Sequence, residues 1–183
     1  QLEGLAPSEK IYSARFMDET AFLVTFRRID PLFAIDLSDP TAPRVTGELK
    51  VTGFSDYLQP INDTHLLGIG RDADPETGRV GELQISLFDV SDLSNPTLVD
   101  RYSFPAHEAT DSEARFDPHA VSWFPETSTL AFPVQRNSWW WSGSSAGSAL
   151  QVYVLVLEQG FQWQGEVPFQ SSVRRSLSIG EFL

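Results

Sequence analysis

Apolar residues gather in short segments along the whole chain, and polar residues separate these segments. The segments are rich in β-branched and aromatic residues, and none shows a sustained helical period. The intervening turns contain Asp, Asn, Pro and Gly, which favour tight reversals of the backbone. The pattern therefore predicts an all-β protein built from short antiparallel strands.

The segments recur with a fixed spacing. The motif FAIDLSDPTAP at residues 33–43 returns as SLFDVSDLSNP at residues 86–96, so that Asp36 and Asp89 are 53 positions apart. Two apolar segments precede each motif and one follows it, which gives four strands per unit. Besides the motifs, the predicted strands are 11–16, 21–26 and 44–51, then 54–61, 65–70 and 97–104, and in a third unit 119–124, 129–134, 149–158 and 161–169.

Several of these segments are apolar at every position, most clearly AFLVTF at 21–26 and VYVLVL at 152–157. A strand that is apolar on both faces belongs to a sheet packed between two other layers. Four-stranded units stacked in this way form a β-propeller, whereas the alternative, a plain β-sandwich, does not require the repeat. We therefore predict a partial β-propeller with about three four-stranded antiparallel blades plus the start of a fourth, at residues 11–51, 54–104, 117–169 and 174–183.

The chain also resembles a family of secreted bacterial and archaeal proteins that contain a C-terminal β-propeller domain. The resemblance is carried by residues 11–74, by GELQISLFDVSDLSNP at 81–96, and more loosely by SEARFDPHAVSWF at 112–124 and RRSLSIGEFL at 174–183. It implies a propeller fold and a secreted or cell-envelope setting, and it implies no catalytic residues. Since a closed propeller uses about four blades or more, we expect the chain to be a piece of a longer protein.

Charge limits the classes of partner. The 183 residues include 25 acidic and 13 basic side chains, which gives a net charge of −12. Such a surface repels phosphate backbones and anionic lipids, so we expect neither nucleic acid nor an anionic membrane as a partner. The longest apolar run, 152–157, is too short to span a bilayer, so no membrane insertion is expected. Because the chain has no cysteine, disulfides and thiolate metal sites are excluded.

One acidic loop is a candidate cation site. Asp72, Asp74 and Glu76 stand at alternate positions before Gly78, and oxygen ligands with this spacing can turn toward a hard cation such as Ca²⁺. The loop lacks the glycine position and the final glutamate of an EF-hand. The alternative is a solvated acidic turn between two strands without any ion.

Three consecutive tryptophans, Trp139, Trp140 and Trp141, fall in the segment between two strands of the third unit, next to a Ser/Gly run. Each ring buries about 150–250 Å² when it is covered, so three rings in water would form an unusual apolar patch. They are candidates for contact with a protein or carbohydrate partner. The alternative is packing within or between blades.

No catalytic set is predicted. GSSAG at 143–147 matches the nucleophile-elbow pattern around Ser145, but that motif needs a strand before it and a helix after it. His65 and His119 lack zinc-site spacing and are expected to cap turns. A repeated group of aspartates follows apolar strands and is expected to fix turns, namely Asp36, Asp39, Asp89 and Asp92.

These observations favour a non-catalytic extracytoplasmic interaction module that presents loops to a protein or glycan partner. The alternative is a hydrolase or other enzyme whose active site is completed by blades outside this chain. We also predict self-association, because the first and last blades would each leave an apolar face in water. The residues assigned to these faces are Tyr12, Phe16, Phe22 and Phe26, and Val152, Val154 and Val156.

Overall fold

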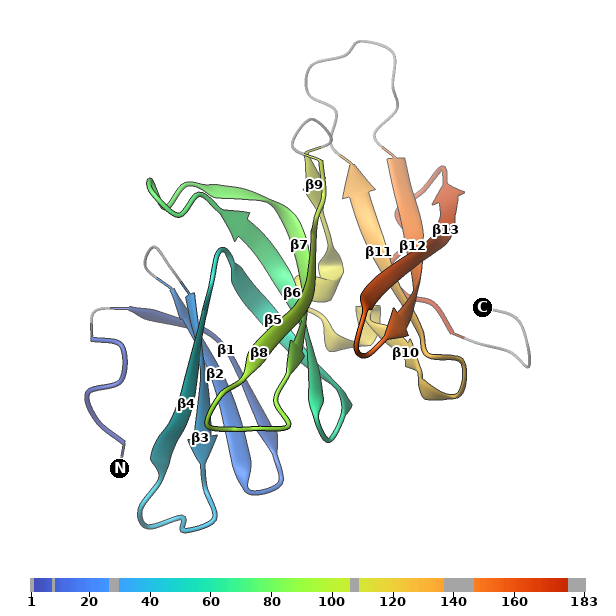
Figure 1. Ribbon diagram of the computed structural model, residues 1–183. Coiled ribbons are helices and arrows are strands. Elements are labelled where there is room, and N and C mark those ends of the chain that lie inside the picture. Colours follow the sequence, from blue (N-terminus) through green and yellow to red (C-terminus); the bar gives the residue numbers. More distant parts are fainter. Residues whose placement is uncertain (1, 8, 27–29, 106–108, 137–146, 178–183) are drawn as a thin grey trace.

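Three antiparallel sheets lie side by side in the computed structural model, which describes residues 2–7, 9–26, 30–105, 109–136 and 147–177 (Figure 1). The helical elements within these residues are single 3-10 turns. No helix in the described part of the chain is long and apolar enough to cross a membrane. The all-β prediction is confirmed.

The first sheet, called blade 1, takes its strands from one uninterrupted stretch of chain. They pair in the order of the sequence and are β1 (Lys10–Met17), β2 (Thr20–Phe26), β3 (Asp30–Asp36) and β4 (Arg44–Val51). These positions agree with the segments predicted from the sequence.

Blade 2 repeats this arrangement with β5 (Phe54–Asn62), β6 (His65–Ala73), β7 (Val80–Asp89) and β8 (Thr97–Ser103). Here β6 and β7 extend further than predicted, because their hairpin continues up to a tight turn after Ala73. In this turn a carboxylate oxygen of Asp74 accepts the N–H groups of Glu76 at 3.0 Å and Thr77 at 2.7 Å. The acidic residues of this loop thus belong to an ordered reversal of the chain.

Blade 3 differs at its first strand. It contains β10 (Ser122–Phe124), β11 (Thr129–Arg136), β12 (Gly147–Val156) and β13 (Gly160–Phe169), and a further short strand, β9 (Thr110–Asp111), pairs with the other end of β11. The first strand position is therefore divided between β9 and β10.

The prediction that this strand begins at His119 was wrong. The 3-10 turns η2 (Glu113–Arg115) and η3 (Pro118–Ala120) lie between β9 and β10. The Asp117 carboxylate accepts the N–H of His119 at 2.9 Å, and Pro118 occupies the first helical position. Both features favour a helical start over an extended strand.

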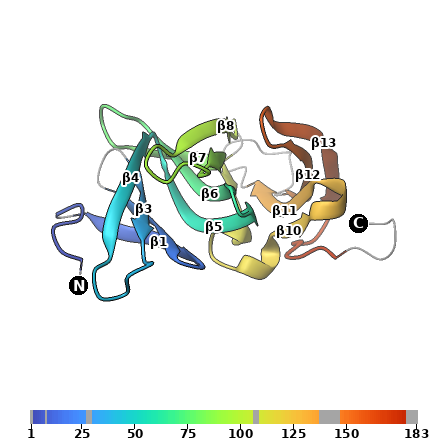
Figure 2. The same ribbon diagram turned by 60° about the horizontal axis from the view of Figure 1, so that its bottom comes forward.

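The three sheets lie next to one another in the ribbon of Figure 2. Apolar side chains join neighbouring blades. Blades 1 and 2 share a core that includes Phe22, Leu32, Phe54, Leu66 and Phe88. Blades 2 and 3 share a second core that includes Ile69, Ile85, Leu130, Phe132 and Tyr153. In the middle sheet, β6 and β7 are buried on both faces, as expected for a sheet packed between two others. The two segments with the clearest apolar pattern, 21–26 and 152–157, lie instead in blades 1 and 3, which each pack against one other sheet within the described residues. Their predicted position between two sheets was therefore wrong.

Two residues assigned to an open face of blade 1 are instead found between blades. Phe22 is fully buried in the core shared with blade 2, and the ring of Tyr12 lies 4.4 Å from that of Phe54. Their assignment to the open face was wrong, because β1 and β2 turn these positions toward blade 2. The opposite face of blade 1 is partly covered by the N-terminal segment, through Leu2 and Leu5.

Of the other residues assigned to the open faces, Phe16 is 68% exposed. Val152, Val154 and Val156 are half-buried on the face of blade 3 that points away from blade 2. The side chain of Phe26 lies outside the described residues.

Turns at the end of β3 and β7 use the same bonds in both blades. In each case an aspartate Oδ1 accepts the N–H two positions further on, at 2.8 or 2.9 Å. The residues are Asp36 and Asp39 in blade 1 and Asp89 and Asp92 in blade 2. Their predicted structural role is confirmed.

The described part of the C-terminal segment forms no strand through residues 172–177. It runs beside the first strand position of blade 3, where Ser176 Oγ donates to Ser122 Oγ at 2.8 Å and Arg175 pairs with Asp117 at 2.9 Å. The start of a fourth blade at 174–183 stays a prediction.

Candidate functional site

The three blades together are called the fan, and the connections between blades lie at one of its ends. This end is at the top of Figure 1, where the β6–β7 turn and the chain that leaves β8 are found. We define the loop face by the described residues 52–53, 74–79, 104–105 and 109–117. The repeated aspartate turns lie at the opposite end of the sheets.

A chain of ion pairs ties this face together. Arg115 Nε lies 2.6 Å from an Asp56 carboxylate oxygen, and Arg115 Nη1 lies 2.8 Å from Asp111 Oδ1. Asp111 also pairs with Arg71 at 3.0 Å. Arg115 and Asp56 have side chains only 10% and 11% exposed, so this pair is held away from most of the solvent. The insertion between β9 and β10 is thereby fixed to β5 and β6 of blade 2.

Burial and ion pairing shift the pKa values of these groups in opposite directions. Burial raises the pKa of Asp56, although the Arg115 guanidinium opposes this rise. Burial would also raise the pKa of Asp111, but hydrogen bonds from Arg115 and Ser112 lower it below its usual value. For Arg115, burial alone would lower the pKa, and the two carboxylates raise it instead. The network therefore keeps Arg115 charged inside the fold.

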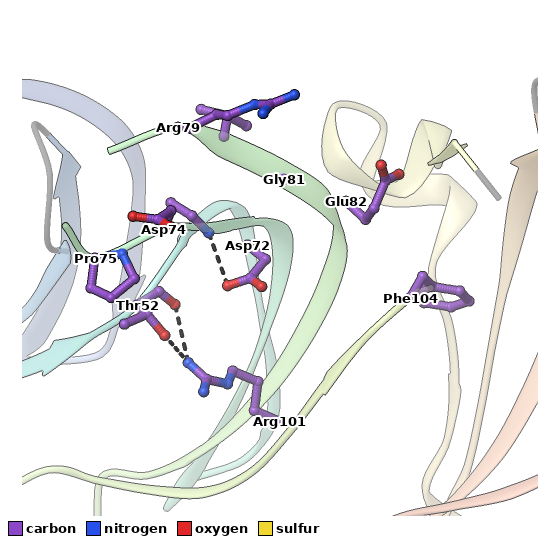
Figure 3. Close-up of a pocket in the computed structure, with 11 residues that line it drawn as sticks. Thr52, Asp72, Asp74, Pro75, Arg79, Gly81, Glu82, Arg101 and Phe104 are labelled. Atoms are coloured by element: carbon purple, nitrogen blue, oxygen red, sulfur yellow. Dashed lines mark hydrogen bonds between the residues drawn. The ribbon is translucent and has the colours of Figure 1, made fainter. Parts of the chain in front are cut away.

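Beside this network, a pocket of about 750 Å³ opens between the β6–β7 hairpin and the start of blade 2 (Figure 3). Its charged lining combines acidic groups with two arginines, namely Asp72, Asp74, Glu82, Arg79 and Arg101. Arg101 donates to the backbone carbonyl and the hydroxyl of Thr52, which holds it across the floor of the pocket (Figure 3). Glu82 accepts the N–H of Thr110 at 3.0 Å and connects the pocket wall to β9.

Three stacked antiparallel sheets, two of which share the same aspartate turns, define the architecture, and a comparison with known families agrees. The pattern of the beta propeller domain family matches residues 1–183. The chain belongs to the beta propeller domain family. Its sequence-based assignment to β-propeller proteins is confirmed.

Two archaeal relatives of this propeller domain are similar over part of their length. An uncharacterized protein of Methanocaldococcus jannaschii is 41% identical over 139 residues, which cover 76% of this chain and 21% of that protein. An uncharacterized protein of Archaeoglobus fulgidus is 43% identical over 102 residues, which cover 56% of this chain and 15% of that protein. The propeller domain thus matches about a fifth or less of each relative's length.

The residues predicted to hold calcium are only partly brought together in the propeller domain. Asp72 and Asp74 line the loop-face pocket, whereas Glu76 is not among its lining residues. Backbone N–H groups of Thr77 and Glu76 lower the pKa of Asp74, because they stabilise its charged form. Within the described ranges, no group of three or more His, Asp or Glu side chains is arranged to hold a metal ion. The calcium site stays a prediction.

Two other candidates from the sequence, Ser145 and the run Trp139, Trp140 and Trp141, lie outside the described residues. The histidines are better defined. His119 Nδ1 lies 3.0 Å from the Asp117 carboxylate, and His65 Nδ1 lies 2.9 Å from the Thr64 hydroxyl. Both histidines therefore lie in or beside a turn, but the side chains that accept the N–H groups of these turns are Asn62 and Asp117, not the predicted histidines.

Sequence reasoning missed the buried ion-pair network. The pairing of Asp111 with Arg115 follows the i, i+4 spacing and was detectable in principle. Asp56 and Arg71 lie far from Arg115 in sequence, and no local pattern points to their meeting. Only the packing of the insertion against blade 2 brings them together.

Proposed function

We propose that this propeller domain is a non-catalytic interaction module that works outside the cytoplasm and presents its loop face to a protein or glycan partner. The setting rests on the resemblance to secreted propeller proteins. A stack of rigid blades with variable connections suits binding, because the scaffold holds the loops while their sequences differ.

The observation that carries this proposal is the anchoring of the loop face by Arg115. Through Asp56 and Asp111 this side chain links the chain that leaves blade 2 to the inner part of the same blade. A binding surface that is ordered before the partner arrives loses less conformational entropy on association. The ion-pair network therefore supports recognition by the neighbouring pocket.

The pocket itself favours a polar partner. Its volume of about 750 Å³ falls within the range of about 300–1,000 Å³ that is usual for ligand sites. Arginines and carboxylates stand on its wall together, so that it offers both donors and acceptors of hydrogen bonds. Such a lining suits a charged loop of a protein or the hydroxyl groups of a glycan.

The test is capture of a partner by the immobilised domain, using a glycan array and the cell-envelope proteins of the organism that produces the domain. Arg79→Glu reverses an exposed charge in the pocket and should abolish or strongly weaken capture. The matched control is Glu126→Lys, which reverses an exposed charge at the opposite end of blade 3 and should leave capture unchanged.

Equal capture by both variants and the unmodified domain would exclude the loop face as the binding surface. Chemical conversion of a captured glycan by the unmodified domain would contradict the non-catalytic assignment and favour an enzyme instead.

A further inference from the structure

A second opening lies at the outer rim of the fan, between β8 of blade 2 and β12 and β13 of blade 3. This rim cleft has a volume of about 490 Å³. It is lined by Asp100, Arg101, Tyr102, Tyr153, Phe161 and Trp163. Both of its walls belong to described blades, so the cleft does not arise from a missing neighbour. Its lining is mainly aromatic, unlike that of the loop-face pocket.

Trp163 is held in place although the residue is 61% exposed. Its indole Nε1 donates to Gln151 Oε1 at 3.1 Å, and Gln151 Nε2 in turn donates to Glu166 Oε2 at 2.6 Å. The same Glu166 oxygen accepts from Arg136 at 2.7 Å. A hydrogen-bonded chain thus orients a large apolar surface that is in contact with water.

The floor of the rim cleft offers an unused polar group. Tyr153 is only 2% exposed, and its ring stacks on Phe132 with centroids 6.0 Å apart and planes 8° from parallel. Its hydroxyl makes no hydrogen bond to any residue that the structure describes, and it is not one of the fully buried polar atoms that lack a partner, so it is open to the cleft. Burial raises the pKa of Tyr153, so the hydroxyl keeps its proton and can both donate and accept.

Polar groups also flank the aromatic surface. Asp100 accepts the N–H of Arg101 at 2.8 Å and that of Phe161 at 2.9 Å, one on each oxygen. Each carboxylate oxygen keeps a lone pair for a further donor. Arg101 also lines the cleft, but its guanidinium donates to Thr52 at the loop-face pocket, so Asp100 supplies the acceptors of this wall, and they suit the hydroxyl groups of a ligand.

We propose that the rim cleft binds a pyranose ring of a neutral saccharide. The apolar face of the sugar stacks on Trp163, and its hydroxyls exchange hydrogen bonds with the Tyr153 hydroxyl and the Asp100 carboxylate. A sugar ring is flat, apolar on its faces and polar at its edge, and these properties match the aromatic wall and the polar floor. The proposal deepens the interaction-module function and rests on it, but it assigns a site away from the loop face.

The test titrates the domain with cellohexaose, chitohexaose, mannohexaose and maltohexaose, using calorimetry and tryptophan fluorescence. At least one hexaose should bind with a dissociation constant in the millimolar range or below. Trp163→Ala should weaken that binding about 10-fold or more, because it removes the stacking surface. Tyr153→Phe keeps the ring, removes only the hydroxyl, and should weaken binding roughly 3- to 10-fold.

The matched control is Phe169→Ala, which removes an exposed aromatic ring on the opposite face of β13 and should leave the affinity unchanged. The proposal is overturned if no hexaose binds the folded domain, or if Trp163→Ala and Tyr153→Phe bind as well as the unmodified protein. Loss of a captured protein in Trp163→Ala, without any hexaose binding, would assign the cleft to that protein instead. If partner capture depends on Arg79 but not on Trp163, the proposed function of the loop face is retained without the rim cleft.

Discussion

Arg115 and Asp56 form a buried ion pair across 59 positions of the chain, with Nε and Oδ2 2.6 Å apart. The pair joins the insertion in blade 3 to the first strand of blade 2. Replacing Arg115 with Met keeps much of the apolar stem but leaves a buried carboxylate without its partner. We expect this change to lower the free energy of unfolding by about 3–5 kcal/mol, measured by urea denaturation.

The control for this variant is Lys50→Ala, which removes an exposed ion pair with Glu48. Exposed pairs contribute little because water and salt screen them, so Lys50→Ala should unfold close to the unmodified protein. An equally small effect of Arg115→Met would show that the network adds nothing to stability.

Gly160 is a second point of contact between blades 2 and 3. It begins β13 with φ at +96°, and a Cβ at this position would collide with the Asp100 carboxylate. Gly160→Ala should therefore lower the free energy of unfolding by about 1–3 kcal/mol through strain and displacement. Gly81→Ala is the control, because its Cβ would meet only ordinary contacts at 3.5 Å from Asp72. Thermal unfolding of both variants tests this expectation. Equal melting temperatures of Gly160→Ala and Gly81→Ala would contradict it.

Acidification should destabilise the domain through its aspartate turns. Hydrogen bonds from Ser38 and Arg44 lower the pKa of Asp36 from 3.8 to about 2. Folded Asp36 thus binds its proton less tightly than the unfolded chain does. This group favours the folded state above pH 3.8, and its contribution is lost as the pH falls through about 2. Urea titrations across this interval should show that the free energy of unfolding depends less on pH in Asp36→Asn than in the unmodified domain. An identical pH dependence in both proteins would refute this expectation.

The predicted calcium site has a direct test. A cation that binds only the folded state raises the melting temperature. If Asp72, Asp74 and Glu76 bind calcium, millimolar calcium should raise the melting temperature of the unmodified domain relative to a chelator, and Asp72→Asn should remove this rise. The absence of any shift would rule out the site and leave these residues as a structural turn.

Self-association is expected at the free face of blade 3. Within the described residues no further sheet covers Val152, Val154 and Val156, and apolar surface of this kind tends to become an interface. Light scattering at rising concentration should give masses above the monomer mass of 20.4 kDa, and Val154→Lys should return them toward this value. A mass of 20.4 kDa at every concentration would contradict the prediction.

The strands were predictable because each is short, apolar and bounded by Asp, Asn, Pro or Gly. The repeat from Asp36 to Asp89 then supplied the number of strands per blade. The division of the first strand of blade 3 was harder to predict, since Pro118 and Asp117 act locally against a strand that the repeat favours. The sequence contained the necessary signal, but the periodic pattern outweighed it.

The sites were less predictable than the fold. Asp72 and Asp74 were identified from their spacing, and they do line a pocket. The rim cleft was missed because Trp163 and Tyr102 lie on different blades, and nothing near either residue in the sequence points to the other. Contacts between blades depend on the twist and spacing of whole sheets, which local patterns do not encode.

Each sheet of blades 1 and 2 takes its four strands from one continuous stretch, with neighbouring strands adjacent in sequence. This arrangement has a consequence for biosynthesis. Contacts between neighbours in sequence form quickly, and growing chains fold from the N-terminus as they leave the ribosome. Blade 1 can therefore pair all its strands before blade 2 has been translated. Its residues Phe22 and Leu32 are then available for blade 2 to pack against. We therefore expect the order of assembly to follow the order of translation.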